Sequence, residues 1–315
     1  MKKTLITFGK SIAILFIGII GLFGLIRGGL NVTKFLIYPE YYSIESNLCL
    51  NPGLSDGFVH QGIGVIDSED KIVVSGYMKD NSASRLYVTD LNNNSYYVSL
   101  YSNSKEFTGH AGGVSCSKDN VYLVSDNSIY IITIDALLNA KNEDIIDIGD
   151  GIPVNNEASF SYCDDTYLYV GEFHDGQNYI TNHQYQTNDG TFYAIVSKYD
   201  LNDLIKPIKI YSIRNKVQGI CFTPDGKVIL STSYGLADSH YYVYNDADAI
   251  NSNLTLDGAP VYYLNNCLND IKGPAMAEGL DYYKDKIITL TESASDKYIF
   301  GKFFLANYIV LLDIK

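Results

Sequence analysis

The sequence predicts an all-β chain folded as a β-propeller of five blades, with six as the alternative, behind one N-terminal transmembrane helix. Three observations predict it: a hairpin pattern recurs five times, strand-favouring residues are abundant, and one apolar run lies near the N-terminus. The 315 residues include 28 Tyr, no Trp and only 7 Pro. Tyr, Ile, Val, Thr and Phe suit the pleated, half-buried surface of a strand. The length allows one large β domain.

The recurring pattern is a motif whose second residue is small and whose third is apolar. An Asp lies seven residues after the start of the motif, and another small residue lies thirteen residues after the start. The first copy is two residues longer, so Asp70 and Gly76 take these places in it. The copies begin at Gln61, Gly112, Ala158, Gln218 and Glu278. We interpret each copy as a β-hairpin, in which the small residues let backbones crowd around an axis and the Asp occupies the turn. Two more strands would complete each four-stranded blade, and the spacing of the copies suits such blades.

The last unit ends with a third strand, from Tyr308 to Asp313, and has no fourth strand of its own. A segment near the N-terminus, from Tyr42 to Leu50, would supply it. This pairing would close the ring and remove an open sheet edge.

An apolar run from Ser11 to Ile26 lies between Lys10 and Arg27. It spans about 24 Å as a helix, and the flanking cations can snorkel to both membrane interfaces. The Lys bias places the N-terminus in the cytoplasm. A cleaved secretory signal is the alternative, but residues 25–29 lack the small-residue pattern of a cleavage site.

We therefore expect three parts: a signal-anchor at residues 1–30, a stalk at 31–46 and the propeller at 47–315. The protein would cross the cell membrane once, with the propeller outside the cytoplasm. The formal net charge is −13. Nucleic acid would repel so acidic a domain, and we expect no nucleic-acid partner.

Five cysteines are present, namely Cys49, Cys116, Cys163, Cys221 and Cys267. They form no CxxC pair and no cluster with His, so a zinc site is not expected. Cys116, Cys163 and Cys221 fall in expected inner strands, where Cys acts as a small buried hydrophobe. A disulfide between Cys49 and Cys267 stays open.

In a propeller, the start of each first strand and the end of each second strand meet at one mouth of the central channel. Three long insertions, at 173–190, 233–240 and 293–303, leave from the same end, and loops on a rigid scaffold often bind ligands. The residues that we expect to bind a ligand there are Gln61, His110, Asp126, Glu157, Glu172, Gln218, Glu278 and Glu292.

These residue types allow three activities. Acids and carbonyls could bind Ca²⁺, which takes six to eight oxygen ligands. Acids and tyrosines could bind a glycan, with rings stacking on sugars. Paired carboxylates could hydrolyse a glycosidic bond. Alternatively, the polar groups only solvate a water-filled channel. No nucleophile elbow, P-loop, zinc-protease motif or dinucleotide fingerprint is present.

The segment from Lys216 to Val228, with a Gly-apolar stretch and a Pro-Asp-Gly turn, resembles the inner hairpin of gluconolactonase, regucalcin and YVTN-repeat propellers. The region from Gln61 onward also resembles membrane-anchored propellers of low-GC Gram-positive bacteria. In the lactonase family, acid and amide side chains hold a central divalent metal. The resemblance implies Asn156, Glu157 and Glu278 as ligands of such a metal here, and the acids at the mouth make Ca²⁺ the candidate cofactor. Those enzymes have six blades, however, and we count five.

Five-bladed propellers include lectins and glycosidases, so the fold alone does not choose between functions. We expect a cell-surface propeller that binds a ligand, either a glycan or a cation, at the channel mouth. A hydrolase acting on a glycan or a lactone at the same mouth is the first alternative. A non-catalytic scaffold that contacts a surface protein is the second.

Overall fold

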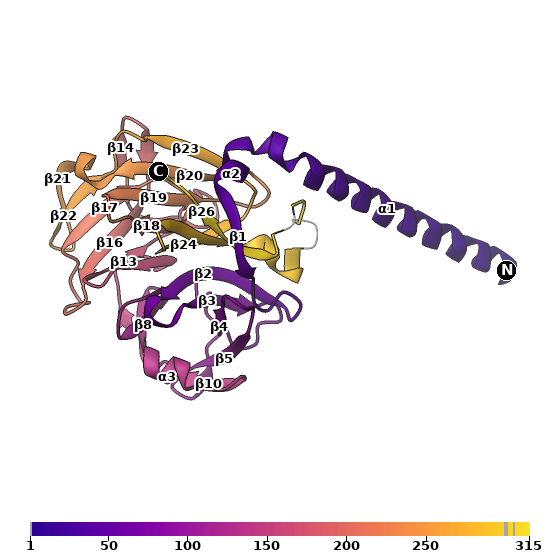
Figure 1. Cartoon of the computed structure of the whole chain (residues 1–315), viewed down its shortest axis with the longest axis horizontal. Coiled ribbons are helices and arrows are strands. Elements are labelled where there is room, and N and C mark those ends of the chain that lie inside the picture. Colours follow the sequence, from indigo (N-terminus) through magenta and orange to yellow (C-terminus); the bar gives the residue numbers. More distant parts are fainter. Residues whose placement is uncertain (1, 299–301, 305) are drawn as a thin grey trace.

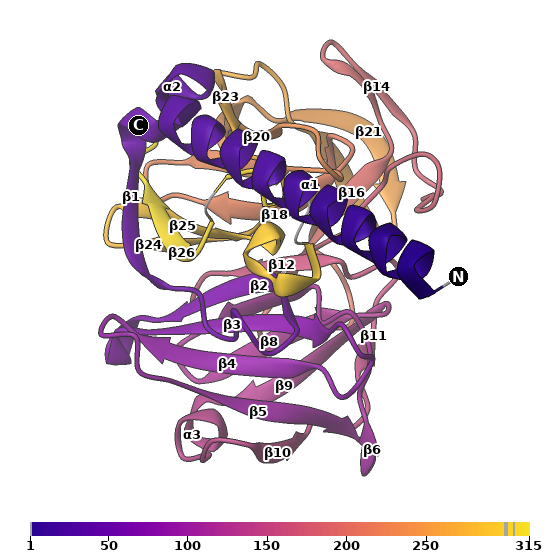
Figure 2. The same cartoon turned by 90° about the vertical axis from the view of Figure 1, so that its right-hand side faces the viewer.

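The computed structural model describes residues 2–298, 302–304 and 306–315, and it shows one long helix attached to a ring of five main sheets (Figure 1). The five-bladed propeller is confirmed. Each blade contains four antiparallel strands, and successive blades follow one another along the chain. Figure 2 looks onto this ring, with the helix in front of it.

The first two blades come from residues 58–153. Blade 1 contains β2 (Phe58–Ile66), β3 (Lys71–Met78), β4 (Arg85–Asp90) and β5 (Ser95–Ser102), with η1 (Asp67–Glu69) in its first turn. Two short strands extend it, β6 (Lys105–Glu106) and the parallel β10 (Asp144–Asp147). Blade 2 contains β7 (Gly113–Cys116), β8 (Asn120–Ser125), β9 (Ser128–Thr133) and β11 (Ile152–Pro153), with α3 (Ile134–Leu138) after β9.

Blades 3 and 4 carry the longest insertions. Blade 3 contains β12 (Phe160–Cys163), β13 (Tyr167–Gly171), β16 (Ala194–Asp200) and β17 (Lys209–Ile213). A small hairpin, β14 (Tyr185–Thr187) and β15 (Gly190–Phe192), stands between β13 and β16. Blade 4 contains β18 (Val217–Phe222), β19 (Lys227–Thr232), β20 (Ser239–Asn245) and β23 (Asn269–Gly273). Its excursion after η2 (Asp246–Asp248) forms β21 (Ile250–Leu256) and β22 (Ala259–Tyr263), which extend blade 3.

Blade 5 joins the two ends of the propeller. It contains β24 (Ala277–Tyr283), β25 (Lys286–Thr291), β26 (Tyr308–Leu312) and β1 (Glu45–Leu50), with η3 (Glu292–Ala294) and η4 (Asp296–Tyr298) after β25. β1 pairs with β26 in antiparallel register, Asn47 opposite Val310. The expected closure by the segment before Leu50 is therefore confirmed.

The motif copies found in the sequence fall at the first strands β2, β7, β12, β18 and β24, where backbones crowd. A Cβ atom added to Gly62 would lie 2.4 Å from the backbone nitrogen of Val114 in the next blade. One added to Gly279 would lie 2.9 Å from the nitrogen of Ile63. The small residues are thus required where the inner strands of neighbouring blades touch.

The abundant tyrosines largely belong to the core. Tyr211, Tyr241 and Tyr244 are among the largest fully buried side chains, and they share one hydrophobic cluster with strands of blades 3, 4 and 5. Burial of such rings contributes large apolar area, while each hydroxyl still finds a polar partner. Tyr211, for example, donates to Asp246 at 2.7 Å.

Helix α1 (Lys2–Ile37) includes a stretch, Lys10–Ile37, that is long and apolar enough to cross a membrane, with a mean hydropathy of 2.2. A second helix, α2 (Pro39–Ile44), follows at once and leads into β1. The expected stalk at 31–46 is thus helical as far as Ile44. Tyr41 of α2 is buried, with its ring 5.9 Å from that of Tyr241.

All five cysteines are free thiols. Cys49 lies in the core between blades 5 and 1, whereas Cys267 packs against the cluster of blades 3 to 5. These two residues therefore form no disulfide here. Cys116, Cys163 and Cys221 are buried in inner strands, as expected.

Candidate functional site

A pocket of about 560 Å³ opens at the end of the ring where the first strands begin and the second strands end. All five blades contribute to its wall. Six of the eight residues expected to bind a ligand line it: Gln61, His110, Asp126, Glu157, Gln218 and Glu292. The structure thus brings together residues that are more than 200 positions apart in the sequence. Their binding of a ligand stays a prediction.

The other two expected residues, Glu172 and Glu278, lie behind the wall, each with 2% of its surface exposed. Oε1 of Glu172 accepts a bond of 3.1 Å from the backbone N–H of Ile195 and lies 3.2 Å from Nε2 of His183. Burial raises the pKa of the Glu172 carboxyl, and His183 opposes this shift. Glu172 therefore holds the blade 3 insertion in place.

Glu278 sits directly behind Gln218, whose amide nitrogen donates to Oε1 of Glu278 at 3.3 Å. Burial, and then the charge of Glu292, raise the pKa of the Glu278 carboxyl well above its ordinary value. The protonated form is therefore favoured, because a buried carboxylate beside another acid is unfavourable.

Glu292 is the centre of a hydrogen-bond network at the wall of the pocket. Its Oε1 accepts bonds from Tyr298 at 2.7 Å, from Gln61 at 3.1 Å and from Tyr77 at 3.4 Å. Nζ of Lys297 donates to the Tyr77 hydroxyl at 2.5 Å. Burial raises the pKa of the Glu292 carboxyl, although Tyr298 and Lys297 favour its charged form.

His110 forms part of an aromatic wall with Tyr77, their ring centroids 4.5 Å apart. Burial lowers the pKa of His110, and the charge of Asp126 acts against this change. A neutral imidazole is therefore favoured. The preceding Gly109 gives room for Asp126, since a Cβ atom there would lie 2.2 Å from Oδ2 of Asp126.

The insertions of blades 3 and 4 supply a second aromatic wall. The Phe173 ring lies 5.4 Å from that of Tyr179, edge to face, and 6.1 Å from that of Tyr234. Asn178 donates to the Tyr234 hydroxyl at 3.1 Å and so ties the two insertions together. Oδ1 of Asp175 accepts from the backbone N–H groups of Tyr179 and its two predecessors, which fixes the turn.

Several pocket residues were not among the expected binding residues, notably Tyr234, Met276, Lys297 and Tyr298. Three of them lie in or beside the insertions, so the insertion boundaries were the available signal. Other polar residues of the blade 3 insertion have structural contacts instead. His174, for example, is buried, stacks on Tyr193 and lies 2.9 Å from the Thr181 hydroxyl.

The three expected metal ligands do not form a set of free oxygen donors. Nδ2 of Asn156 donates to the Val170 carbonyl at 2.8 Å, and its Oδ1 accepts from Ala158 at 3.1 Å. Glu157 is exposed, whereas Glu278 is buried in a setting that favours its proton. Among the residues that the structure describes, no three His, Cys, Asp or Glu side chains are grouped so as to hold a metal ion. The implied calcium ion does not fit this arrangement.

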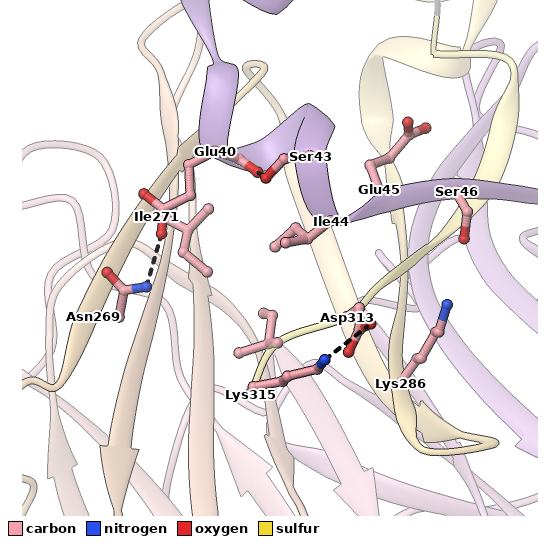
Figure 3. A pocket seen from close by; sticks show the side chains of 11 residues that line it. Glu40, Ser43, Ile44, Glu45, Ser46, Asn269, Ile271, Lys286, Asp313 and Lys315 are labelled. Atoms are coloured by element: carbon pink, nitrogen blue, oxygen red, sulfur yellow. Dashed lines mark hydrogen bonds and ion pairs between the residues drawn. The ribbon is translucent and has the colours of Figure 1, made fainter.

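A second, more open pocket of about 530 Å³ lies at the junction of α2, β1, β23 and the C-terminal residues (Figure 3). In it, Asn269 donates to Glu40 at 2.9 Å, and Lys315 faces Asp313 at 4.0 Å. Lys315 is largely exposed, and such surface pairs contribute little energy. None of the expected binding residues lines this pocket, and we assign it no ligand.

Comparison with known proteins gives structural likeness only. No protein-family model matches the chain, and no curated protein matches it. Similar solved structures include a glutaminyl cyclase from Myxococcus xanthus, with 8% identity, coverage of 86% of this chain and 95% of that one, and a TM-score of 0.46. A putative glucose dehydrogenase from Thermus thermophilus has 10% identity, coverage of 85% and 99%, and a TM-score of 0.43.

The PQQ-bound aldose sugar dehydrogenase from Streptomyces coelicolor also has 10% identity and a TM-score of 0.43, with coverage of 79% of this chain and 77% of that one. Likeness at this level says nothing about a shared activity. By its strand order, this chain is a five-bladed propeller with a pocket at one mouth of its ring.

Proposed function

We propose that this protein is a membrane-anchored propeller that stands outside the cytoplasm and binds a glycan in the mouth pocket. One observation supports this most directly. Aromatic rings from blades 1, 3, 4 and 5 border a single pocket that also presents amide, hydroxyl and carboxylate groups. The volume lies within the range of ligand pockets, roughly 300–1,000 Å³.

A sugar ring needs both kinds of surface. Its C–H faces pack on aromatic rings, which are large and rigid, and Tyr179, Tyr234 and Tyr298 offer such rings. Its hydroxyls need donors and acceptors at once. Gln61 and Gln218 provide amides, and carboxylates such as Asp126 accept strong, charge-assisted bonds.

The orientation in the membrane is part of the proposal. Lys2, Lys3 and Lys10 precede the apolar stretch, and positive charge is enriched on the cytoplasmic side. The propeller, which follows the helix, would then lie outside, where glycans are abundant.

The test is a glycan-binding screen with the full chain in phosphatidylcholine nanodiscs, because glycoside detergents would themselves present sugars to the pocket. For the best glycan, we expect Tyr179→Ala and Tyr234→Ala to weaken binding at least about tenfold, or 1.4 kcal/mol. The matched control is Tyr282→Ala, at the hairpin end of β24 and outside the pocket. Wild-type affinity in all three variants would mean that the glycan binds outside this pocket. If no glycan binds at all, the scaffold function is favoured instead.

A hydrolase at the same mouth is the second candidate, and the environment of Glu292 favours it. A glycosidase uses a carboxylic acid whose pKa is raised to protonate the leaving group, and burial raises the pKa of Glu292. If the protein is a hydrolase, Glu292→Gln will stop the release of reducing ends from the bound glycan. The affinity of this variant for the glycan will stay within about threefold of the wild-type affinity. A wild-type protein that binds the glycan without cleaving it would exclude this activity.

A further inference from the structure

The pocket at the channel mouth is connected to the membrane helix through the segment that follows β25. Lys297 and Tyr298 of η4 line the pocket. A few residues later, the Phe303 ring lies 6.1 Å from that of Phe23 in α1, and the Phe303 carbonyl accepts a bond of 3.1 Å from Asn31. One wall of the pocket is therefore attached to the anchor.

A second pocket loop is attached to the same helix end. Tyr234 and Gly235 line the pocket, and Asp238 in the same insertion accepts a bond of 2.6 Å from the hydroxyl of Tyr38, the residue that follows α1. The Tyr38 ring also lies 5.3 Å from that of Phe304. The helix thus leaves the propeller beside the pocket. Figures 1 and 2 show it running away from that face of the ring, with the yellow segment after β25 over the middle.

The contacts also set the distance between the mouth and the membrane. Phe23 and Asn31 lie on either side of Arg27, the cation expected at the outer interface. About 20 residues suffice to span the hydrocarbon core, and the apolar stretch runs from Lys10 to Ile37. Because Phe303 touches the helix on both sides of Arg27, the segment that follows β25 lies close to the expected membrane surface.

Apolar side chains project from the loops on this face. Ile180 is 68% exposed, Leu236 is 60% exposed and Tyr179 is 52% exposed. All three lie in the two insertions that form the aromatic wall. Apolar residues on a surface that is held against a membrane are stabilised at the boundary between headgroups and acyl chains.

From these observations we infer that the glycan taken by the mouth pocket is the headgroup of a lipid in the same membrane. This inference rests on the proposed function. A headgroup would rise directly from the bilayer into a pocket that faces it. The acids Asp126, Glu157 and Glu292, against Lys297 and a His110 whose neutral form is favoured, disfavour an anionic phosphate headgroup. The ligand class is therefore a glycolipid whose headgroup is an uncharged or amino sugar.

The first arm of the test measures orientation, with the full chain in nanodiscs that carry a nitroxide-labelled headgroup lipid. A fluorophore is attached to L236C, and in a second sample to K118C, which lies in the exposed turn between β7 and β8. The background is Cys267→Ser, since the other cysteines are buried. We expect quenching to be several-fold stronger at position 236. Equal quenching at both positions would overturn the inference even if a glycan binds.

The second arm separates the lipid from the free sugar. A fluorescent glycan probe is displaced either by monoglucosyl-diacylglycerol within the disc or by methyl glucoside in solution, with phosphatidylglycerol discs as the control. We expect the lipid to displace the probe at a concentration at least tenfold lower than the free sugar, and Tyr234→Ala to lose both responses. Displacement by the free sugar alone would keep the proposed function and refute the lipid ligand. Displacement by neither would refute the lipid ligand, and failure of the glycan probe itself to bind would refute the proposed function as well.

Discussion

The carboxylate of Asp281 on β24 accepts a hydrogen bond of 2.8 Å from the backbone N–H of Val65 on β2. This bond joins the fifth blade to the first across the inner ring. Asp281 also accepts from the N–H of Tyr282 at 2.7 Å. Burial raises the pKa of the Asp281 carboxyl to about 8, although both hydrogen bonds favour its charged form.

Asp281 should make stability fall as the pH rises. An unfolded Asp has a pKa of about 3.9, so between about pH 4 and pH 8 the folded chain holds a proton that the unfolded chain has released. The free energy of unfolding then decreases with pH, by at most about 1.4 kcal/mol per unit from this group, and levels off above about pH 8. We expect urea unfolding from pH 5 to pH 8 to show this decrease.

Asp281→Asn should make the free energy of unfolding decrease less steeply with pH. A smaller decrease should remain, because the raised pKa of Glu278 acts in the same direction. Asp119→Asn, in the exposed turn between β7 and β8, should leave the slope unchanged. Identical slopes for wild type and Asp281→Asn would contradict a raised pKa at Asp281.

Gly62→Ala should destabilise the ring strongly. Its new methyl group would lie 2.4 Å from the backbone nitrogen of Val114, and a backbone atom cannot turn aside as a side chain can. Overpacking usually lowers the free energy of unfolding by about 1–3 kcal/mol, and we expect about 3 kcal/mol or more in chemical denaturation. Ser115→Ala, on the adjoining inner strand, adds no atom and removes only the bond of its hydroxyl to Ser161, so it serves as the milder comparison. A change below about 1 kcal/mol at Gly62 would show that the inner strands can move apart.

Removal of β1 should open the ring. A chain that begins at Asn51 lacks the strand that covers β26, whereas a chain that begins at Glu45 retains this strand and is otherwise identical. The uncovered edge would expose Val310 and Leu312, and open edges promote aggregation. We expect the shorter chain to melt lower by on the order of 10 °C, or to aggregate, as measured by thermal unfolding with light scattering. Equal melting temperatures would mean that blade 5 is stable with three strands.

Much of the fold was predictable from the sequence, since it depends on local patterns. Small residues at the starts of inner strands, such as Gly62 and Gly279, mark where blades touch, and the unpaired third strand at Tyr308 indicated that an N-terminal strand closes the ring. For the site, the sequence predicted which residues gather at the mouth of the channel. Whether an acid there faces the pocket depends on its neighbours: Glu172 bonds to Ile195, 23 residues later, and no pattern near Glu172 shows this.

Calcium should leave the stability of the protein unchanged. Both ends of the Asn156 amide are bonded to the protein, and the surroundings of Glu278 favour its protonated form, so two of the three implied ligands are not available as free oxygens. A metal bound to the folded state at about 100 times its Kd would add about 2.7 kcal/mol. We expect no such difference when the full chain is unfolded by heat in excess Ca²⁺ and in EDTA. A rise in melting temperature in Ca²⁺ that is lost in Glu278→Gln would instead indicate a metal at the mouth. The exposed control, Glu106→Gln, should then still show the rise.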